Sequence, residues 1–198
     1  MTPILFLRHG PTEWNVIGRV QGHTDVPLSD EGRAAVRRWR LDDAFRDFDW
    51  VASPLSRAQE TARLLGAATC GSEPRLAEAN WGEWEGRILE ELRAELGEEL
   101  AANEARGLDL SPPGGESPRD VCNRLREWLA ELAPLRQPTV AVVHAGVLRA
   151  AYTLATGWDM SRAAPLRRGH SFGHLYDLDS DGSLTVRELN IPLEPEDG

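Results

Sequence analysis

The chain has 198 residues, 41% of them hydrophobic and 27% charged, which is the balance of an ordinary soluble domain. This composition excludes a disordered chain, a collagen-like repeat and a coiled coil, and no apolar run is long enough to cross a bilayer. We expect a single domain over residues 1–198, with no export signal and a place in the cytoplasm.

Charge restricts the chemistry further. The net charge is −10, from 32 acidic and 22 basic residues, and every basic residue is an arginine. The acidic balance argues against nucleic acid or an anionic membrane as a partner. The lack of lysine excludes Schiff-base chemistry and a P-loop. Arginine presents a fork of donors that fits carboxylate or phosphate, so an anionic substrate would be bound by a local arginine cluster.

The first predicted strand is the buried apolar run 3–7, which ends at Arg8 and His9. A helix is predicted to open at Ser29, a favoured N-cap residue that two acids follow. Its inward-facing residues are expected to be Val36, Trp39 and Phe45.

A second short strand is predicted at 49–52, and the helix after it would take Ser53 as N-cap and Pro54 as its first residue. That start places Arg57 in the first helical turn. The highly charged stretch 88–106 is predicted to be helical. The Pro-Pro-Gly-Gly run at 112–115 prevents the helix from continuing further.

The last third of the chain predicts a helix capped by Ser117, with apolar residues at helical spacing behind it. The clearest buried strand is 139–143, which ends at His144, and a further helix begins at Ala145. Residues 175–178 and 184–189 are predicted to form a closing hairpin.

Two features bear on metal binding. Cys70 and Cys122 lack CxxC spacing, which excludes a disulfide scaffold and a cysteine-rich zinc site, and both are expected to be small buried residues. The segment Asp177–Glu188 fits the EF-hand calcium-loop pattern, but strand-like residues flank it and Asp181-Gly182 is a hairpin turn pair. We therefore expect a hairpin here and no metal.

The alternation of strands and helices predicts an α/β fold with a mostly parallel sheet that helices cover on both faces. In such sheets, ligands bind outside the carboxyl ends of the strands. Three predicted strand ends carry Arg8 with His9, Arg57, and His144. If these strands are neighbours, two histidines and two arginines meet in one pocket.

Such a pocket has a definite chemistry. Two guanidinium groups bind a phosphate dianion and also lower the pKa of a nearby imidazole. A neutral imidazole is a nucleophile that can accept a phosphoryl group, and a carboxylic acid is then needed to protonate the leaving alkoxide. Guanidinium charge can stabilise the transition state, so neither a metal nor a cofactor is required.

The motifs resemble, in their order along the chain, those of the histidine phosphatase superfamily, the phosphoglycerate-mutase-like proteins. They are RHGPTEWN at 8–15, GHTDVPL at 22–28, SPLSRA at 53–58, LAE at 76–78, WGEWEG at 81–86, GGES at 114–117 and HAG at 144–146. The resemblance covers nearly the whole chain. It implies a Rossmann-like three-layer α/β/α sandwich with a helical lid at about 87–118.

The same resemblance implies roles for individual residues. His9 would be the nucleophile that becomes phosphorylated, and Glu78 the proton donor to the leaving group, with Glu13 and Glu83 as alternatives. Arg8, Arg57 and a cationic His144 would hold the phosphoryl oxygens. Further substrate-binding groups are expected at Gly10, Thr12, Asn15, Ala145, Gly146 and His170. His170 is a departure from the family pattern, since many relatives carry asparagine at that position.

Two enzymatic outcomes follow from a phosphohistidine, because transfer to water makes a phosphatase and transfer to a retained monophosphate makes a mutase. Phosphoglycerate mutases of this superfamily are usually longer between the equivalents of Glu78 and His144, and typically carry lysine where this chain has Arg87. The pattern looks more like the phosphatase branch, such as α-ribazole phosphatase and small broad-specificity phosphatases. A phosphoglycerate mutase and a non-catalytic phosphate-binding protein are the alternatives. The expected partner is a small phosphorylated metabolite, with α-ribazole 5′-phosphate, sugar phosphates and nucleotides all compatible.

Overall fold

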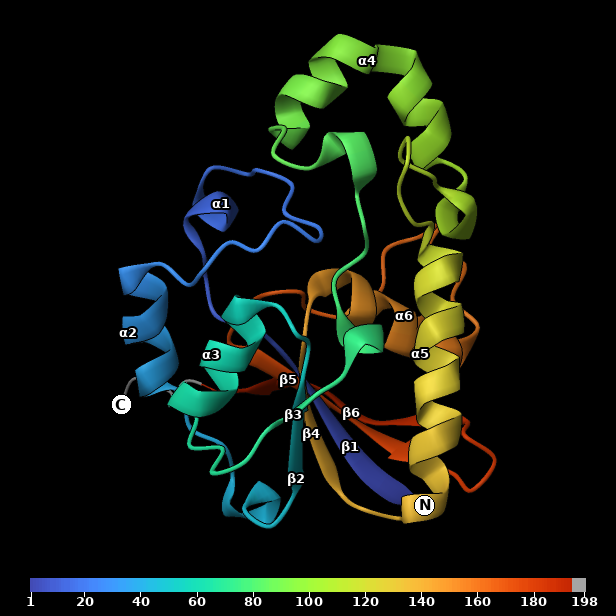
Figure 1. Cartoon of the computed structure of the whole chain (residues 1–198). Helices are drawn as coiled ribbons and strands as arrows, with labels where there is room; N and C mark the ends of the chain where they lie inside the picture. The colour runs from blue at the N-terminus through green and yellow to red at the C-terminus, as the bar shows by residue number, and fades with distance from the viewer. Residues whose placement is uncertain (194–198) are drawn as a thin grey trace.

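The computed structural model describes residues 1–193, which form a central six-stranded sheet with helices around it (Figure 1). The strands are β1 (Thr2–Arg8), β2 (Asp49–Ala52), β3 (Gly71–Ser72), β4 (Thr139–Val143), β5 (Phe172–Leu178) and β6 (Leu184–Pro192). The helices are α1 (Glu13–Val16), α2 (Asp30–Arg38), α3 (Ser56–Leu64), α4 (Leu89–Glu104), α5 (Pro118–Leu132) and α6 (Ala145–Thr156). Within residues 1–193, no helix has the length and apolar character needed to span a membrane.

The order of strands in the sheet is β3-β2-β4-β1-β5-β6. The first four strands of this order run parallel, and β5 pairs antiparallel with both β1 and β6. The predicted mostly parallel sheet is therefore confirmed, and β2, β4 and β1 are direct neighbours. Arg8 is in register with Val143, so the next residues, His9 and His144, leave the sheet at the same level.

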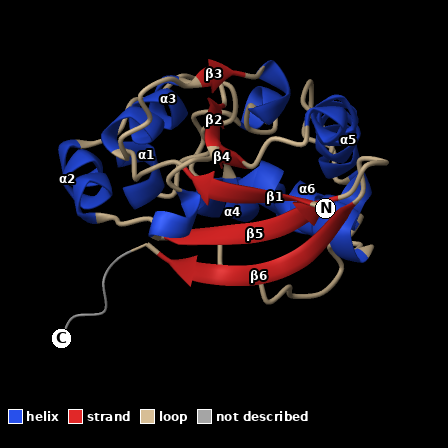
Figure 2. Cartoon of the chain, turned by 90° about the horizontal axis from the view of Figure 1, so that it is seen from below, coloured by secondary structure: helices blue, strands red, loops and turns tan. Residues whose placement is uncertain are grey.

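Helices cover both faces of the sheet, as the sequence predicts. Successive side chains of a strand point to opposite faces. Ile4 and Phe6 of β1 pack in the core that α5 and α6 complete, whereas Leu5 and Leu7 pack in the core that α2 completes. All four side chains are fully buried. Figure 2 shows α2 and α3 at the left of the sheet and α5 at the right.

Helix starts test the predicted caps. The hydroxyl of Ser29 accepts a hydrogen bond from the Gly32 backbone, which confirms the cap of α2. This helix ends at Arg38, and Phe45 is buried from a separate 3₁₀ turn at Asp43–Phe45. Ser53 as the N-cap of α3 was wrong, because the cap position falls on Leu55. The Ser53 hydroxyl lies instead 2.8 Å from Nε2 of His144, and Arg57 still falls in the first turn.

The predicted helix at 88–106 corresponds to α4, which is not continuous. Gly97 lies in the middle of α4 with φ +49° and ψ −119°, a conformation that glycine adopts without steric cost. The two halves of α4 form an arch over the carboxyl ends of the strands (Figure 1). A small separate core of Trp84, Leu92 and Leu100 holds this arch together.

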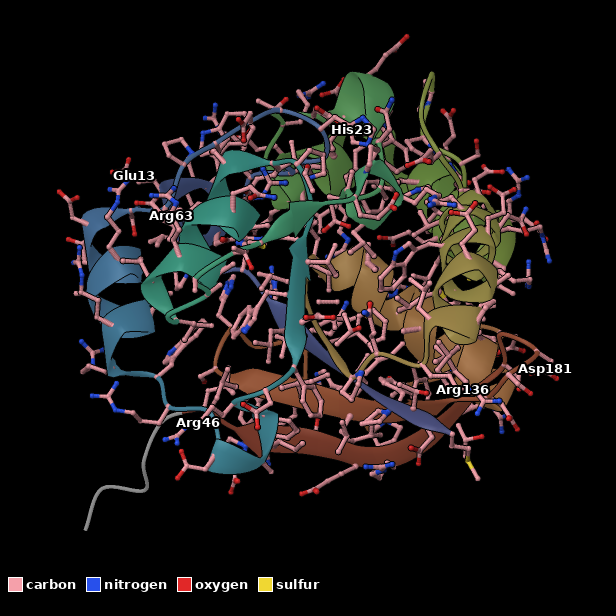
Figure 3. All side chains as sticks on the ribbon, turned by 60° about the horizontal axis from the view of Figure 1, so that its bottom comes forward. Glu13, His23, Arg46, Arg63, Arg136 and Asp181 are labelled. Atoms are coloured by element: carbon pink, nitrogen blue, oxygen red, sulfur yellow. The ribbon has the colours of Figure 1, made fainter. Side chains whose placement is uncertain are left out.

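The carboxyl-terminal hairpin is confirmed, with strands longer than predicted. Gly182 (φ +85°) and hydrogen bonds between Asp179 and its neighbours form the turn that joins β5 to β6. An EF-hand loop needs a helix on each side, and this segment lies between two paired strands. Asp181 lies at the outer edge of the molecule (Figure 3). Of the two cysteines, Cys122 is buried and Cys70 is only half-buried.

Candidate active site

His9 and His144 meet at the carboxyl edge of the sheet, as the strand ends predict. The His9 backbone N–H donates to the Val143 carbonyl over 2.9 Å, which extends the pairing of β1 and β4 up to both histidines. The ring centroids of His9 and His144 are 5.0 Å apart. His9 is 2% exposed and His144 is fully buried.

The tautomer of His9 is set by its neighbour Gly10. The Gly10 carbonyl lies 2.7 Å from Nδ1 of His9 and has no hydrogen to give, so Nδ1 carries the proton and donates. Nε2 of the neutral ring then carries no proton and has a free lone pair. Gly10 is itself fixed, because its N–H donates to Thr61 Oγ1 over 2.9 Å and a Cβ at this position would lie 2.4 Å from Val36 Cγ2. Gly10 therefore orients the His9 ring through its carbonyl and does not line the cavity.

Charge and burial keep His9 neutral. Burial is the largest cause of a pKa well below the ordinary histidine value, and the nearby ionisable side chains of His144, Arg8, His170 and Arg57 lower it further. The sequence predicts a neutral imidazole on the strength of the two arginines alone. In the structure, the two arginines contribute to the same shift, and desolvation is its leading cause.

The surroundings of His144 in the structure favour its neutral form, not the cationic form that the family resemblance implies. Burial first, and then Arg57 and Arg8, lower the pKa of His144 well below the ordinary value. The Ser53 hydroxyl lies 2.8 Å from Nε2, and Ser53 Oγ already accepts from the Leu55 N–H. Ser53 is thus placed to donate its own proton to Nε2, which leaves the proton of the neutral ring on Nδ1. Within residues 1–193, Nδ1 of His144 is buried without a hydrogen-bond partner.

Arg57 and Arg8 each hold a guanidinium group beside the histidines. Arg57 is fully buried and donates to the carbonyls of Gly22 and Thr24 at 2.8 and 3.0 Å. Arg8 donates to the backbone carbonyl of Arg168, and burial lowers the pKa of Arg8 to about 10. In the part of the chain that the structure describes, the Nε atoms of both arginines are buried without a partner. Buried unsatisfied donors of this kind indicate an anion site, because an unmade hydrogen bond costs free energy.

The three candidate carboxylates are separated clearly by the fold. Glu78 lines the same cavity as His9, and its Oε1 accepts from the backbones of Ala79 and Gly146, both at 2.9 Å. Glu13 is exposed in α1 at the outer edge of the molecule (Figure 3), and Glu83 is exposed outside this cavity. The geometry therefore favours Glu78 over both alternatives.

The remaining predicted site residues divide into two groups. Asn15, Ala145 and Gly146 line the cavity. Thr12 does not, because its buried hydroxyl forms a capping box with Asn15 at the start of α1 and also contacts Gln21. His170 lies beside the nucleophile, with ring centroids 5.3 Å apart, and its Nδ1 donates to the His9 carbonyl over 2.6 Å.

The cavity has a volume of about 460 Å³ and extends from His9 to the α4 arch. Four lining residues come from the 87–118 segment, namely Leu89, Arg93, Glu104 and Leu110. Trp81 and Trp84 also line it, stacked with centroids 6.2 Å apart. The sequence analysis missed four arginines that this cavity gathers: Arg19, Arg93, Arg149 and Arg168. Nothing in their local sequence distinguishes them from surface arginines, since only the tertiary fold brings them together.

Metal-ligating side chains do not gather anywhere in residues 1–193, where no group of three or more histidine, cysteine, aspartate or glutamate side chains could hold an ion. The catalytic cavity instead holds the imidazole of His9 and the carboxyl group of Glu78, and the guanidinium groups of arginines are the permanent cations among its lining residues. An imidazole among guanidinium groups at the carboxyl edge of an α/β sheet has the groups that phosphoryl transfer requires.

Comparison with known proteins assigns the family. The chain belongs to the histidine phosphatase superfamily (branch 1), whose family model matches residues 4–189. A 2,3-bisphosphoglycerate-dependent phosphoglycerate mutase of Mesorhizobium japonicum is 31% identical, covering 94% of this chain and 97% of the relative. A glucosyl-3-phosphoglycerate phosphatase of Mycobacterium tuberculosis is 35% identical, covering 74% and 72%. The solved structure of an α-ribazole phosphatase from Shigella flexneri superposes with a TM-score of 0.78 at 26% identity, over all of both chains.

Proposed function

We propose that this enzyme is a metal-independent phosphomonoesterase that hydrolyses small phosphorylated metabolites through a phosphohistidine on His9. One observation supports this proposal most directly. Three buried nitrogen atoms without partners in residues 1–193 belong to the groups around His9: Nε of Arg8, Nε of Arg57 and Nδ1 of His144. A phosphoryl group is an acceptor that would satisfy such donors.

In the first step, Nε2 of His9 attacks phosphorus and the ester P–O bond breaks. The leaving alkoxide takes a proton from Glu78 and departs as an alcohol. Glu78 suits this role because hydrogen bonds to the backbone fix its Oε1 atom, while Oε2 has no such partner among the described residues. In the second step, the Glu78 carboxylate takes a proton from water, the water oxygen attacks phosphorus, and the P–N bond breaks to release phosphate and neutral His9.

Positive groups stabilise the charge that develops on the phosphoryl oxygens. Arg8 and Arg57 carry permanent charge, so no metal ion is needed for this purpose. A bound phosphate dianion would also favour protonation of His144. The imidazole can therefore donate a hydrogen bond to a phosphoryl oxygen either as the neutral ring, from Nδ1, or as the cation. Asn15 and the Ala145 backbone amide add neutral donors.

The 87–118 segment would act as the lid over this site. Its residues line the distal part of the cavity, away from the strand ends. A cavity of about 460 Å³ suits a small metabolite, since sites for such ligands typically span about 300–1,000 Å³. α-Ribazole 5′-phosphate, sugar phosphates and nucleotides are the substrate classes to screen.

A phosphoglycerate mutase is the second candidate, because the Mesorhizobium relative has that activity and matches nearly the full length of this chain. Arg87 after Gly86 and the absence of lysine favour hydrolysis. Isomerisation of 3-phosphoglycerate, primed with 2,3-bisphosphoglycerate, should be slow relative to phosphate release. A mutase rate far above hydrolysis would reverse the assignment.

The central test is phosphate release from p-nitrophenyl phosphate in the presence of EDTA. The wild type should turn over with chelator present and should form an acid-labile phosphoenzyme, whereas His9→Ala should lose both properties while keeping its melting temperature within a few degrees. Full turnover by His9→Ala would remove the nucleophile assignment. Glu78→Gln should slow esters with poor leaving groups more than esters with good ones, and Glu83→Gln, a change of the same kind outside the cavity, should slow neither.

A further inference from the structure

A second cavity, of about 250 Å³, opens beside the catalytic one. It is lined by Arg149, Trp158, Met160, Arg162, Ala163, Ala164, Leu166 and Arg168, and we call it the arginine annex. Arg149 and Arg168 line the catalytic cavity as well, so these two side chains form a shared wall between the two spaces. The annex is thus adjacent to the catalytic cavity.

The annex has an unusual balance of charge for this protein. Three arginines line it and no carboxylate does, in a chain whose net charge is −10. Among the described residues, none of the three guanidinium groups forms an ion pair or donates a side-chain hydrogen bond. Other arginines of the chain are neutralised, for example Arg33 by Glu60 and Arg124 by Glu116. Asp159 stands between the annex residues Trp158 and Met160 in the chain, and its carboxylate accepts its hydrogen bonds from Ser161.

Arg149 is the most constrained of the three. It is half-buried in α6, and its guanidinium carbon lies 5.8 Å from the centre of the Trp158 ring. Burial lowers the pKa of Arg149, repulsion from Arg168 lowers it further, and the charge of Glu78 offsets part of this. Arg149 forms no ion pair among the described residues, so a bound anion would relieve both the desolvation and the repulsion.

The annex is also mechanically connected to the phosphoryl site. The backbone carbonyl of Arg168 accepts the hydrogen bond from Arg8, one of the two guanidinium groups beside His9. The same loop therefore carries a wall of the annex and positions a phosphoryl-binding side chain. The wall that Arg149 and Arg168 form also lines the cavity that holds Glu78, so a group bound in the annex would lie beside that cavity.

We propose that the substrate carries a second anionic group, a carboxylate or a phosphate, which Arg149, Arg162 and Arg168 bind in the annex while His9 attacks the first phosphoryl group. This inference rests on the proposed phosphomonoesterase function and names its substrate class. Two charge-assisted contacts to arginine should raise kcat/KM by about tenfold or more over an ester that ends in a neutral group.

The test compares three series of phosphomonoesters with spacers of two to six carbons: ω-hydroxyalkyl phosphates, ω-carboxyalkyl phosphates and α,ω-alkanediol bisphosphates. At the best spacer length, one of the two charged series should exceed the neutral series by about tenfold in kcat/KM. Whichever charged series is preferred identifies the second group. A ratio near one at every length would overturn the proposal.

Variants locate the effect. Arg149→Gln and Arg162→Gln should each lower the ratio of kcat/KM for the charged ester to kcat/KM for the neutral ester by about tenfold, which brings the ratio near one. Arg162 lines only the annex and is exposed, so its replacement tests the annex without disturbing the core. Arg63→Gln, at an exposed arginine of α3 (Figure 3), removes the same charge elsewhere and should leave the ratio unchanged. A preference that persists in both annex variants would place the second site elsewhere and contradict the proposal.

Binding without turnover separates the two proposals. His9→Ala protein titrated with the same esters by calorimetry should bind the preferred charged ester about tenfold more tightly than the neutral one. Tighter binding without any hydrolysis by the wild type would refute the phosphatase function and leave the annex in place. Hydrolysis with equal binding of charged and neutral esters would refute the annex alone.

Discussion

The imidazole rings of His9 and His144 lie 5.0 Å apart at the ends of two paired parallel strands, and both are held neutral by burial and by neighbouring positive charge. At pH 6, the His9 ring should therefore be a neutral imidazole with its proton on Nδ1. Long-range ¹H–¹⁵N NMR distinguishes the two tautomers and the cation directly. A protonated His9 at this pH, or a proton on Nε2, would contradict the assigned nucleophile atom.

Ser53 should matter for activity because its hydroxyl orients His144. Ser53→Ala removes the donor to Nε2, which frees the second tautomer and weakens the Nδ1 contact to a phosphoryl oxygen. We expect kcat/KM to fall by about tenfold, with a loss of stability of about 1 kcal/mol. Ser72→Ala, in the exposed strand β3, is the matched control and should leave both quantities unchanged.

Glu85 joins two loops of the site. Its carboxylate accepts from the backbones of His23, Thr24 and Trp81 and from the Thr24 hydroxyl. Burial acts to raise the pKa of Glu85, but these hydrogen bonds outweigh it and the net pKa is lowered. Arg57 is anchored to the carbonyls of the same loop.

Glu85→Gln should therefore lower the free energy of unfolding by about 1–3 kcal/mol and reduce kcat/KM through misplacement of Arg57. Glu83→Gln makes the same chemical change two positions away on an exposed side chain and should alter neither quantity. Equal behaviour of the two variants in denaturant unfolding and in turnover would show that Glu85 does not position the site.

His174 should make stability depend on pH. It is fully buried, Asn190 donates to its Nδ1, and burial lowers the pKa of His174 to about 4. The unfolded chain binds a proton at this residue near pH 6.5 while the folded chain does not, so stability falls as the pH drops from about 6.5 to about 4. The shift corresponds to at most about 3 kcal/mol.

Denaturant unfolding of the wild type and of His174→Gln across this pH range measures the contribution. The variant is less stable at pH 7, because the histidine packing is lost, but its stability should fall less steeply below pH 6.5. Parallel curves for the two proteins would show that His174 does not cause the dependence.

Much of the catalytic edge could be predicted from the sequence. The apolar runs stop where Arg8-His9 and His144 begin, and this change from apolar to polar residues marks the carboxyl end of each strand. The adjacency of β1, β4 and β2 was only a condition at the level of the sequence, because the alternation of strands and helices does not set the order of strands in the sheet. Ser53 was predicted to be the N-cap of α3, but its hydroxyl contacts the imidazole of His144 instead. A serine before a helix is compatible with either role, and the sequence does not show which distant group lies beside it. The charge of His144 depends on complete burial, which local sequence does not reveal. The arginine annex arises only when α6 and the loop before β5 come together, so no local motif marks it.

The placement of the nucleophile after a central strand has a consequence for how the protein loses activity. β1 and β4 have paired neighbours on both edges, so the amides of these strands can exchange with solvent only when the whole sheet opens. The α4 arch has its own small core and can open by itself. Deuterium should therefore enter the arch long before β1, and thermal inactivation should coincide with cooperative melting of the sheet, not with the earlier loosening of the arch.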